Sequence, residues 1–381
     1  MALWLKNRQF LGATALMVGT MVGVGIFGIP FSFAKAGFLI GLISLVAIGA
    51  ITWLLNLIYG EIVLRTHQRH QIVGYTKKYL GEGWKRVIFF SIILNTYAAL
   101  LAYVSISGDF LSNVLSSFFF ISSSSLSMWF FAIASLLILF GIRTVAWVEL
   151  GLSLMFIAVI FLIFGTGFDK INFSNYAFTN YEFWFFPYGI MLFAFSGLAA
   201  IPLQRQILAE NEIGLRKSIT LAVLVAGVLY LIFGFTVLGI SGEATSPDAI
   251  SGLIDSLGGR IIFLGSLFGA LAISTSYLML GIFLLEVFHQ DYGLNRKISW
   301  FLVVTPPFVL FMGGLRNFID VISLGGAVGI GLEAMVLVFV FMKAKKEGDR
   351  IPEYSLSIPA WALYLLALVF AGGLVYTLIT R

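Results

Sequence analysis

Three glycines near the N-terminus have the spacing of a phosphate-binding loop. Residues 23–28 read Gly-Val-Gly-Ile-Phe-Gly and match G-x-G-x-x-G, which places a pyrophosphate at the start of a helix in dinucleotide-binding folds. That pattern must follow a soluble β-strand, whereas here a hydrophobic run precedes it and Pro30 follows. Tight helix packing through Gly19 and Gly23 would leave the other glycines and the proline unexplained. The crowding instead predicts an interrupted membrane helix, which is tolerated only where it lines a cavity or is buried in protein.

Titratable side chains are rare within the apolar segments. Glu333 lies near the middle of one of them, and because burying a carboxylate there is costly, it is a candidate proton-coupling residue; a structural hydrogen bond is the alternative.

The chain has no Cys, and its three histidines lie in loops at His67, His70 and His289, which argues against a thiolate or histidine metal site. No nucleophile–base arrangement or P-loop motif is present, so an enzyme and an ATP-driven pump are disfavoured and no cofactor is expected.

The composition is that of a membrane protein. Of 381 residues, 60% are hydrophobic and 11% are charged, against roughly 25% charged residues in soluble domains. Spanning the hydrocarbon core takes about 20 apolar residues. The sequence predicts eleven transmembrane helices at about 9–34, 37–63, 86–112, 127–142, 145–166, 183–207, 216–240, 258–287, 298–314, 319–342 and 356–379.

Lys and Arg are distributed unevenly between the loops that join these segments. With a cytoplasmic N-terminus, the outer side keeps only Lys35, Lys170, Arg260, Arg316 and Arg381 of the 23 Lys and Arg residues. By the positive-inside rule, the chain is predicted to lie in the cell (inner) membrane with its N-terminus cytoplasmic and its C-terminus outside. The net charge of +5 then reports topology, and the expected macromolecular partner is the lipid bilayer, not nucleic acid.

The sixth segment is interrupted like the first. It carries Ser196-Gly197 near its middle and Pro202 further on. The first and sixth segments are equivalent if helices 1–5 and 6–10 form two repeats, and because five is odd, the repeats have opposite orientations. Interrupted helices at corresponding positions of two halves indicate the binding site of a transporter. The prediction is one transmembrane domain over 1–381, with repeat one at about 9–166, repeat two at about 183–342 and an extra helix at about 356–379.

The two interruptions suit the two charges of an amino acid. The second half of helix 1 presents free N–H groups around Gly23, Val24 and Gly25 at the positive end of its dipole, which favours a carboxylate. The first half of helix 6 ends in unpaired carbonyls over 193–196, and these carbonyls with the Ser196 hydroxyl favour an ammonium group. We expect glycine at positions 23 and 25 because a side chain there would keep the ligand away from the backbone.

The chain resembles a superfamily of amino-acid transporters. GTMVGVGIFGIP (19–30) resembles the first-helix signature of the amino acid–polyamine–organocation superfamily. FAFSGLAAIP (193–202), AYVSISGD (102–109) and ALAISTSYLMLGIFLLEVF (270–288) are similar to its amino acid/auxin permease branch, particularly prokaryotic aromatic amino-acid permeases. The resemblance covers nearly the whole chain and implies the inverted five-plus-five repeat fold of bacterial sodium–leucine transporters. The chain departs from many members of the branch after Gly197, where they carry bulkier or His-containing sequence.

The resemblance also implies where the substrate lies. In helix 3, Tyr97 and Tyr103 can bring a phenol near the carboxylate, with packing as the alternative for each. Ala199 and Ala200 are small where helix 6 faces the pocket, which leaves room for a large side chain. The expected substrate-binding residues are Thr20, Gly23, Val24, Gly25, Tyr97, Tyr103, Phe193, Phe195, Ser196 and Ala199.

A sodium site is implied between helices 1 and 8. Ala272, Thr275 and Ser276 are spaced i, i+3, i+4 and share one helix face, and by the resemblance they join the carbonyls of Gly19 and Val22. Five oxygens, two of them hydroxyls, suit a hard monovalent cation. The alternative is that these hydroxyls serve as polar contacts between packed helices.

The sequence therefore predicts an all-α secondary active transporter that imports a neutral, aromatic or branched-chain L-amino acid with a coupling ion. Na+ is favoured, and H+ with Glu333 as the titrating group is the alternative. A channel or an amino-acid-sensing membrane protein on the same bundle is the alternative from another class. The oligomeric state is left open, since a monomer is sufficient for this mechanism.

Overall fold

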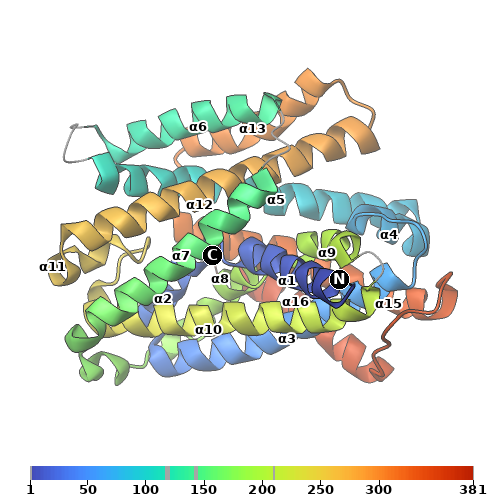
Figure 1. Ribbon diagram of the computed structural model, residues 1–381, viewed down its shortest axis with the longest axis horizontal. Helices are drawn as coiled ribbons and strands as arrows, with labels where there is room; N and C mark the ends of the chain where they lie inside the picture. The colour runs from blue at the N-terminus through green and yellow to red at the C-terminus, as the bar shows by residue number, and fades with distance from the viewer. Residues whose placement is uncertain (1, 116–120, 141–144, 209–210, 381) are drawn as a thin grey trace.

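A computed structural model describes residues 2–115, 121–140, 145–208 and 211–380, and these residues form a bundle of helices (Figure 1). In chain order the α-helices are α1 (Ala2–Met21), α2 (Gly25–Ala36), α3 (Phe38–Leu64), α4 (Ile72–Leu80), α5 (Glu82–Leu115), α6 (Ser123–Phe140), α7 (Val145–Gly167), α8 (Pro187–Ala194), α9 (Ile201–Leu208), α10 (Leu215–Ser241), α11 (Ile254–Leu257), α12 (Gly259–Glu286), α13 (Arg296–Met312), α14 (Phe318–Leu324), α15 (Gly331–Glu347) and α16 (Ala360–Ile379). A π-helical segment, Gly325–Ile330, joins α14 to α15.

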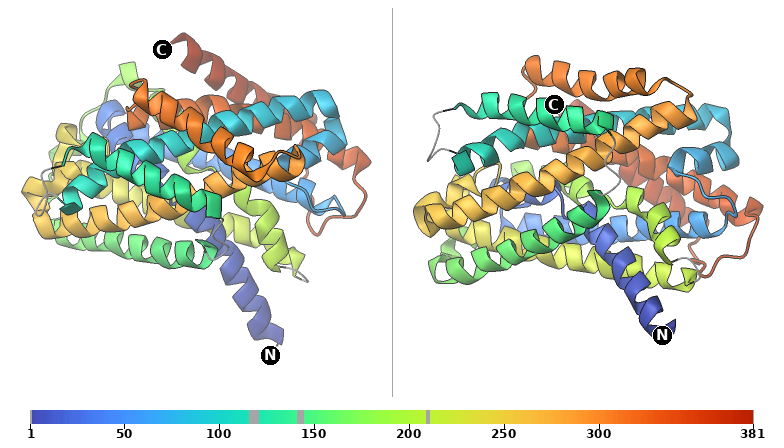
Figure 2. Two further views of the ribbon diagram at one scale, coloured as in Figure 1. Left: turned by 90° about the horizontal axis from the view of Figure 1, so that it is seen from above. Right: turned by 45° about the horizontal axis from the view of Figure 1, so that its top comes forward.

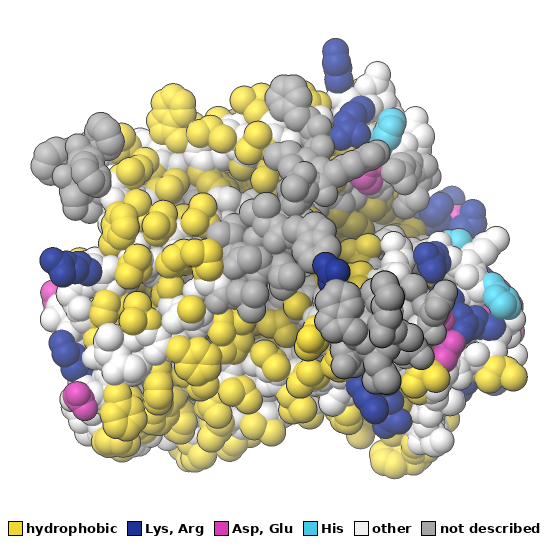
Figure 3. Space-filling view, viewed as in Figure 1, with side chains coloured by type: hydrophobic (Ala, Val, Ile, Leu, Met, Phe, Trp, Pro, Cys, Tyr) yellow, Lys and Arg dark blue, Asp and Glu magenta, His cyan; other side chains and the backbone are white. Residues whose placement is uncertain are grey.

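The bundle has the length and apolarity of a multi-pass membrane protein. Among the described residues, seven helices are long and apolar enough to cross a membrane, and the bent pair formed by α1 and α2 makes an eighth. Hydrophobic side chains cover much of the visible face, and most of its Lys and Arg side chains lie toward the left and right edges (Figure 3). The predicted count of eleven spans is not confirmed. α6 and α13 have 18 and 17 residues where a span needs about 20, and α7, with 23 residues, is not among the spans identified in the described part of the chain.

The first helix is interrupted where the glycines predict. α1 ends at Met21, α2 begins at Gly25, and the two halves are bent by 52°. Val22 still donates to Val18 O at 2.7 Å, after which the regular i to i−4 bonding stops. Figure 2 shows the N-terminal part of α1 protruding from the bundle.

The second interruption lies between α8 and α9. α8 ends at Ala194, and a short 3-10 turn over Leu198–Ala200 leads into α9. Gly197 weakens the helix at this point, and Pro202 lacks the N–H that would bond to the carbonyl of Leu198. The two interrupted helices pack against each other, α1 on α9 and α2 on α8.

Buried hydrogen bonds join the helices into two groups. In the first group, Gln204 of α9 donates to the carbonyl of Ala13 in α1 at 3.0 Å. In the second group, the Trp300 indole of α13 donates to the carbonyl of Ser135 in α6 at 2.7 Å. Further bonds within the groups join Thr14 to Ser218, Gln204 to Ser218, Tyr97 to Leu302 and Ser135 to Tyr277. The site described below lies between the group of α1, α9 and α10 and the group of α5, α6, α12 and α13.

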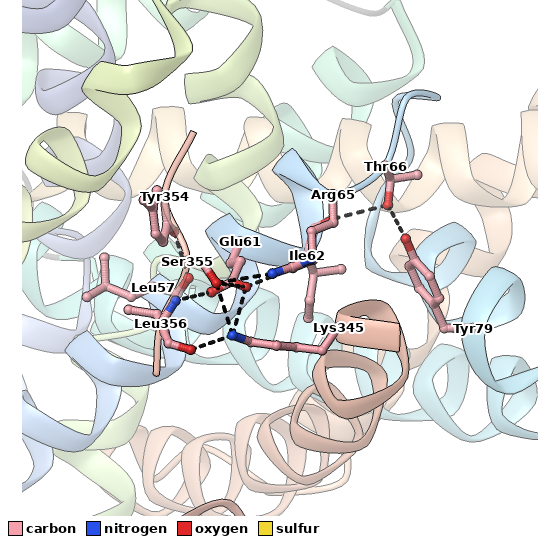
Figure 4. Close-up of polar contacts among 10 residues, drawn as sticks. All are labelled: Leu57, Glu61, Ile62, Arg65, Thr66, Tyr79, Lys345, Tyr354, Ser355 and Leu356. Atoms are coloured by element: carbon pink, nitrogen blue, oxygen red, sulfur yellow. Dashed lines mark hydrogen bonds and ion pairs between the residues drawn. The ribbon is translucent and has the colours of Figure 1, made fainter. Parts of the chain in front are cut away.

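The chain between α15 and α16 covers the end of α3 (Figure 4). Glu61 of α3 is fully buried, and it accepts hydrogen bonds from Arg65 Nε at 2.8 Å and from the Leu356 amide at 2.6 Å. Lys345 Nζ of α15 lies 3.4 Å from the same carboxylate. Because its oxygens are satisfied by three elements, Glu61 has a structural role at this end of the bundle.

Candidate functional site

A cavity of about 190 Å³ lies beside both helix interruptions. Residues of α1, α5, α9, α12 and α15 line it together with the interrupted segments. Eight of the ten predicted substrate residues line this cavity: Thr20, Gly23, Val24, Gly25, Tyr103, Phe193, Ser196 and Ala199. Ser276 from the predicted sodium site and Glu333 line it as well. The structure thus brings together groups from helices that are far apart in the sequence.

Gly23 faces the cavity within the first interruption. In the part of the chain that the structure describes, the N–H groups of Gly23 and Val24 have no backbone acceptor. A Cβ added to Gly23 would lie 3.8 Å from Tyr103 Oη and 3.8 Å from Ser276 Oγ. Open N–H groups at the start of a helix carry partial positive charge. This end of the cavity therefore offers amide donors and hydroxyls of a kind that bind a carboxylate.

Gly25 has a packing role in addition to the role expected for it. A Cβ at this position would lie 2.7 Å from Cα of Ala194, which is closer than real Cβ atoms approach backbone. Gly25 thus allows α2 to pack directly on the end of α8, and the expectation that a side chain here would keep the ligand away from the backbone stays a prediction. Gly25 still lines the cavity, so the two interruptions are held in contact at the site itself.

Phe195, in the second interruption, is turned away from the cavity. Phe193, Ser196 and Ala199 line the cavity, but Phe195 is 2% exposed and its ring centroid lies 5.0 Å from that of Tyr230 on α10. Residues two apart in a helical turn point in different directions because the repeat is 3.6 residues. The assignment of Phe195 to the substrate site is therefore corrected to a packing role.

Tyr97 is also directed elsewhere. Its hydroxyl donates to the carbonyl of Leu302 in α13 at 2.6 Å, and it is not part of the cavity lining. Six residues separate Tyr97 from Tyr103, about 1.7 helical turns, which places the two side chains on different faces of α5. Tyr103 keeps the position predicted for it, and Tyr97 joins α5 to α13.

Tyr230 holds the two interruptions together, a role that the sequence analysis did not predict. It is fully buried in α10, and its hydroxyl lies 2.7 Å from the carbonyl oxygen of Met21 and 2.7 Å from that of Ala194. These carbonyls end α1 and α8, where regular helical donors are missing. One hydroxyl proton is shared between two freed carbonyls, so Tyr230 fixes the spacing of the half-helix ends. A tyrosine in an apolar helix gave no signal of this role.

Of the predicted sodium ligands, Ser276 lies near the first interruption. Ser276 Oγ approaches helix 1 at Gly23, as the distance above shows. Thr275 Oγ1 donates to the carbonyl of Ala272 in its own helix at 2.9 Å, which leaves the oxygen lone pairs of Thr275 available to a cation. Gly19 and Val22 are buried at the end of α1. The ion site itself stays a prediction.

A second polar region of the cavity lies toward the start of α5. Glu333 is 5% exposed, and Asn95 Nδ2 of α5 donates to its Oε1 at 3.4 Å. Asn95 Oδ1 is buried and has no hydrogen-bond partner among the described residues. Tyr59 of α3 lines the cavity beside them. Asn95 was missed, although an amide inside an apolar segment is itself an indication of function.

Comparison with known proteins places this architecture among amino-acid carriers. The sequence profile of the tryptophan/tyrosine permease family matches residues 6–380. The chain is 23% identical to tyrosine-specific transport system 1 of Haemophilus influenzae, with 91% of this chain and 90% of that protein covered. It is 23% identical to the tryptophan-specific transport protein of Shigella flexneri, with coverage of 96% and 94%. It is 22% identical to glutamine transporter 2 of Aliivibrio fischeri, with coverage of 91% and 92%.

The fold is also similar to a solved structure. The crystal structure of MhsT in complex with L-phenylalanine superimposes with a TM-score of 0.60 at 15% sequence identity, and the alignment covers 97% of this chain and 98% of that chain. At this identity the likeness concerns the fold alone, so the all-helical architecture expected from the sequence is confirmed.

Proposed function

The chain belongs to the tryptophan/tyrosine permease family, and from this premise we propose that it imports a neutral L-amino acid, aromatic or branched-chain, together with a coupling ion. The family and the relatives are permeases, so the protein is a transporter and not an enzyme. The proposal rests chiefly on one observation, the cavity that both helix interruptions line. Such a site beside paired interrupted helices is what a carrier uses to hold and occlude its cargo.

The two ends of an amino acid fit the two interruptions. The unpaired amides of Gly23 and Val24 support binding of the carboxylate, and the Ser196 hydroxyl with carbonyls at the end of α8 supports binding of the ammonium group. The small Ala199 and Ala200 leave space in the cavity for a large neutral side chain. The basic loops support a cytoplasmic N-terminus and an outer C-terminus in the cell (inner) membrane.

Sodium is the proposed coupling ion, with the proton as the alternative. The hydroxyls of Thr275 and Ser276, with Ser276 close to the first interruption, support a Na+ site that would share helix 1 with the cargo. The buried Glu333 in the cavity wall supports proton coupling instead. No other cofactor is proposed, and one copy of the chain contains every group that the proposal needs.

Counterflow in proteoliposomes tests the proposal. Vesicles containing the purified protein and unlabelled tryptophan are diluted into a trace of labelled tryptophan. A carrier transiently accumulates the label by exchange, and this accumulation saturates with tryptophan concentration. Leakage of label without accumulation would identify a channel, and binding without exchange would identify a sensor. Either result would overturn the proposed function.

A further inference from the structure

One face of α5 presents two polar groups to the cavity with a small apolar residue between them. Asn95, Ala99 and Tyr103 are each four residues apart, which places them on the same helix face, and all three line the cavity. The eight residues from Asn95 to Tyr103 correspond to a rise of about 12 Å. Side chains lean toward the start of their helix, so Tyr103 leans toward Asn95. A flat ring fits against Ala99 between the two polar groups.

The Asn95 amide has a buried oxygen that lacks a donor among the described residues. Glu333 is 5% exposed, and Asn95 Nδ2 is 3.4 Å from its Oε1, which is a long contact. With the Glu333 carboxylate ionised, exchanging the oxygen and nitrogen of the Asn95 amide would turn two acceptor oxygens toward each other, so the amide nitrogen is placed on the side of Glu333. Asn95 Oδ1 is then left buried without a donor. Unpaired buried acceptors are costly, and here they border a cavity.

We propose that Asn95 and Glu333 are specificity-determining residues that accept the hydrogen-bond donor on the ring of an aromatic substrate. The inference rests on the proposed function: with the carboxylate and ammonium groups at the interruptions near Gly23, the side chain extends along Ala99. The indole N–H of tryptophan and the phenol O–H of tyrosine each supply one donor to this acceptor pair. The cavity would thus be polar at both ends and apolar in the middle.

Phenylalanine and aliphatic amino acids lack that donor. Their binding would leave Asn95 Oδ1 without water and without a donor among the described residues, and it would add no donor to the Glu333 carboxylate beyond the long contact from Asn95 Nδ2. Sites built to hydrogen-bond a substrate reject analogues that lack the group far more strongly than they reject a missing methylene. The acceptor pair therefore favours tryptophan and tyrosine over substrates of similar size and apolarity.

The experiment compares ligands that differ only in the donor. Dissociation constants are measured by isothermal titration on the purified full chain for tryptophan and for benzothienylalanine, in which sulfur replaces the indole N–H. The same measurement compares tyrosine with phenylalanine. We expect each donor-bearing ligand to bind about tenfold or more tightly than its partner. Equal affinities within each pair would overturn the inference without any variant being made.

Variants then test whether the preference depends on Asn95 and on an acceptor oxygen at position 333. Asn95→Ala should weaken tryptophan about tenfold and change benzothienylalanine by less than about threefold. Glu333→Gln keeps an acceptor oxygen, so it should keep most of the preference even if it abolishes proton coupling. Tyr97→Phe is the matched control, because it removes a hydroxyl from the same helix outside the cavity, and it should leave the ratio unchanged.

The failures of the two proposals are distinguishable. If Asn95→Ala weakens both ligands of a pair equally, Asn95 supports the fold of the site and the inference is wrong. If none of tryptophan, tyrosine, phenylalanine and leucine binds to the unaltered protein, the proposed function itself fails. If all four bind with similar affinity, the proposed function stands and the acceptor pair has no role in specificity.

Discussion

At the scale of single residues, two neighbouring glycines have different tasks. A Cβ on Gly23 would meet only ordinary contacts, each at 3.8 Å, with Thr20 O, Tyr103 Oη and Ser276 Oγ. A Cβ on Gly25 would lie 2.7 Å from the Cα of Ala194. The first glycine keeps cavity space open, and the second allows two helices to touch. A substitution at each position separates binding from packing.

Gly23→Ala is expected to weaken amino-acid binding at least tenfold with little change in stability, because the methyl group occupies cavity space beside the unpaired amides. Gly25→Ala is expected to lower the free energy of unfolding by about 1–3 kcal/mol through overpacking. Tryptophan titration and thermal unfolding of the two purified variants check this pair. A stable Gly25→Ala protein would show that α2 and α8 separate easily.

At the scale of helices, the Tyr230 hydroxyl donates to two carbonyls that the interruptions leave without helical donors. Tyr230→Phe keeps the ring but leaves the carbonyls of Met21 and Ala194 without their donor, which costs about 1–3 kcal/mol. We expect a lower unfolding temperature and weaker amino-acid binding, since the half-helix ends are no longer held at one spacing. Tyr176→Phe is the control. It removes a hydroxyl that donates to the carbonyl of Phe235 in α10, the helix that also carries Tyr230, away from the cavity. Binding that survives Tyr230→Phe would mean that packing alone positions the interruptions.

The C-terminal end of α3 depends on a buried cation from α9. Arg205 is 4% exposed, donates from Nη1 to the carbonyls of Val63 at 2.6 Å and Thr66 at 2.9 Å, and pairs with Glu212 through Nε at 2.9 Å. Arg205→Ala is expected to reduce the free energy of unfolding by about 3 kcal/mol, because it leaves the buried carbonyls of Val63 and Thr66 without their donor and removes one of the two arginine partners of Glu212. Chemical or thermal unfolding in detergent measures this. Lys77→Ala, which removes an exposed ion pair with Glu82, should have an effect below about 1 kcal/mol.

At the scale of the whole molecule, the coupling ion decides which gradient drives uptake. If Na+ binds between helix 1 and α12, then Na+ and the amino acid tighten each other's binding by the same factor. Thr275→Ala should then weaken the sodium dependence of uptake far more than it alters amino-acid binding at saturating Na+. Glu333→Gln should leave the sodium dependence intact, because this carboxylate is not a proposed ligand of the ion.

Uptake into proteoliposomes under separate sodium and proton gradients makes the measurement for both variants. Uptake that ignores sodium, follows a pH gradient and is lost in Glu333→Gln would contradict sodium coupling. That result would identify a proton-coupled carrier in which Glu333 titrates. The two ions therefore predict opposite responses of the same two variants.

Features that depend on local chemistry can be predicted from the amino-acid sequence. The long apolar segments indicate a membrane protein. They also predict helices, because only helices or closed barrels satisfy the backbone hydrogen-bonding groups within a bilayer. Gly23, Gly25 and Gly197, with the prolines near them, predicted where helices stop, since these residues weaken or break helical hydrogen bonding wherever they occur. Glu333 was noticed for the same reason, because a carboxylate in an apolar segment is costly without any knowledge of its neighbours.

The direction in which each side chain points depends on how the helices pack and could not be predicted from the sequence. Tyr97 and Tyr103 are equivalent candidates in the sequence, but packing directs one hydroxyl to Leu302 and the other to the cavity. The partners of Tyr230 are 209 and 36 residues away in the chain, and those of Asn95 and Gly25 are also distant. Such contacts depend on how helices rotate and pack around the interruptions, and no periodicity within one helix encodes that rotation.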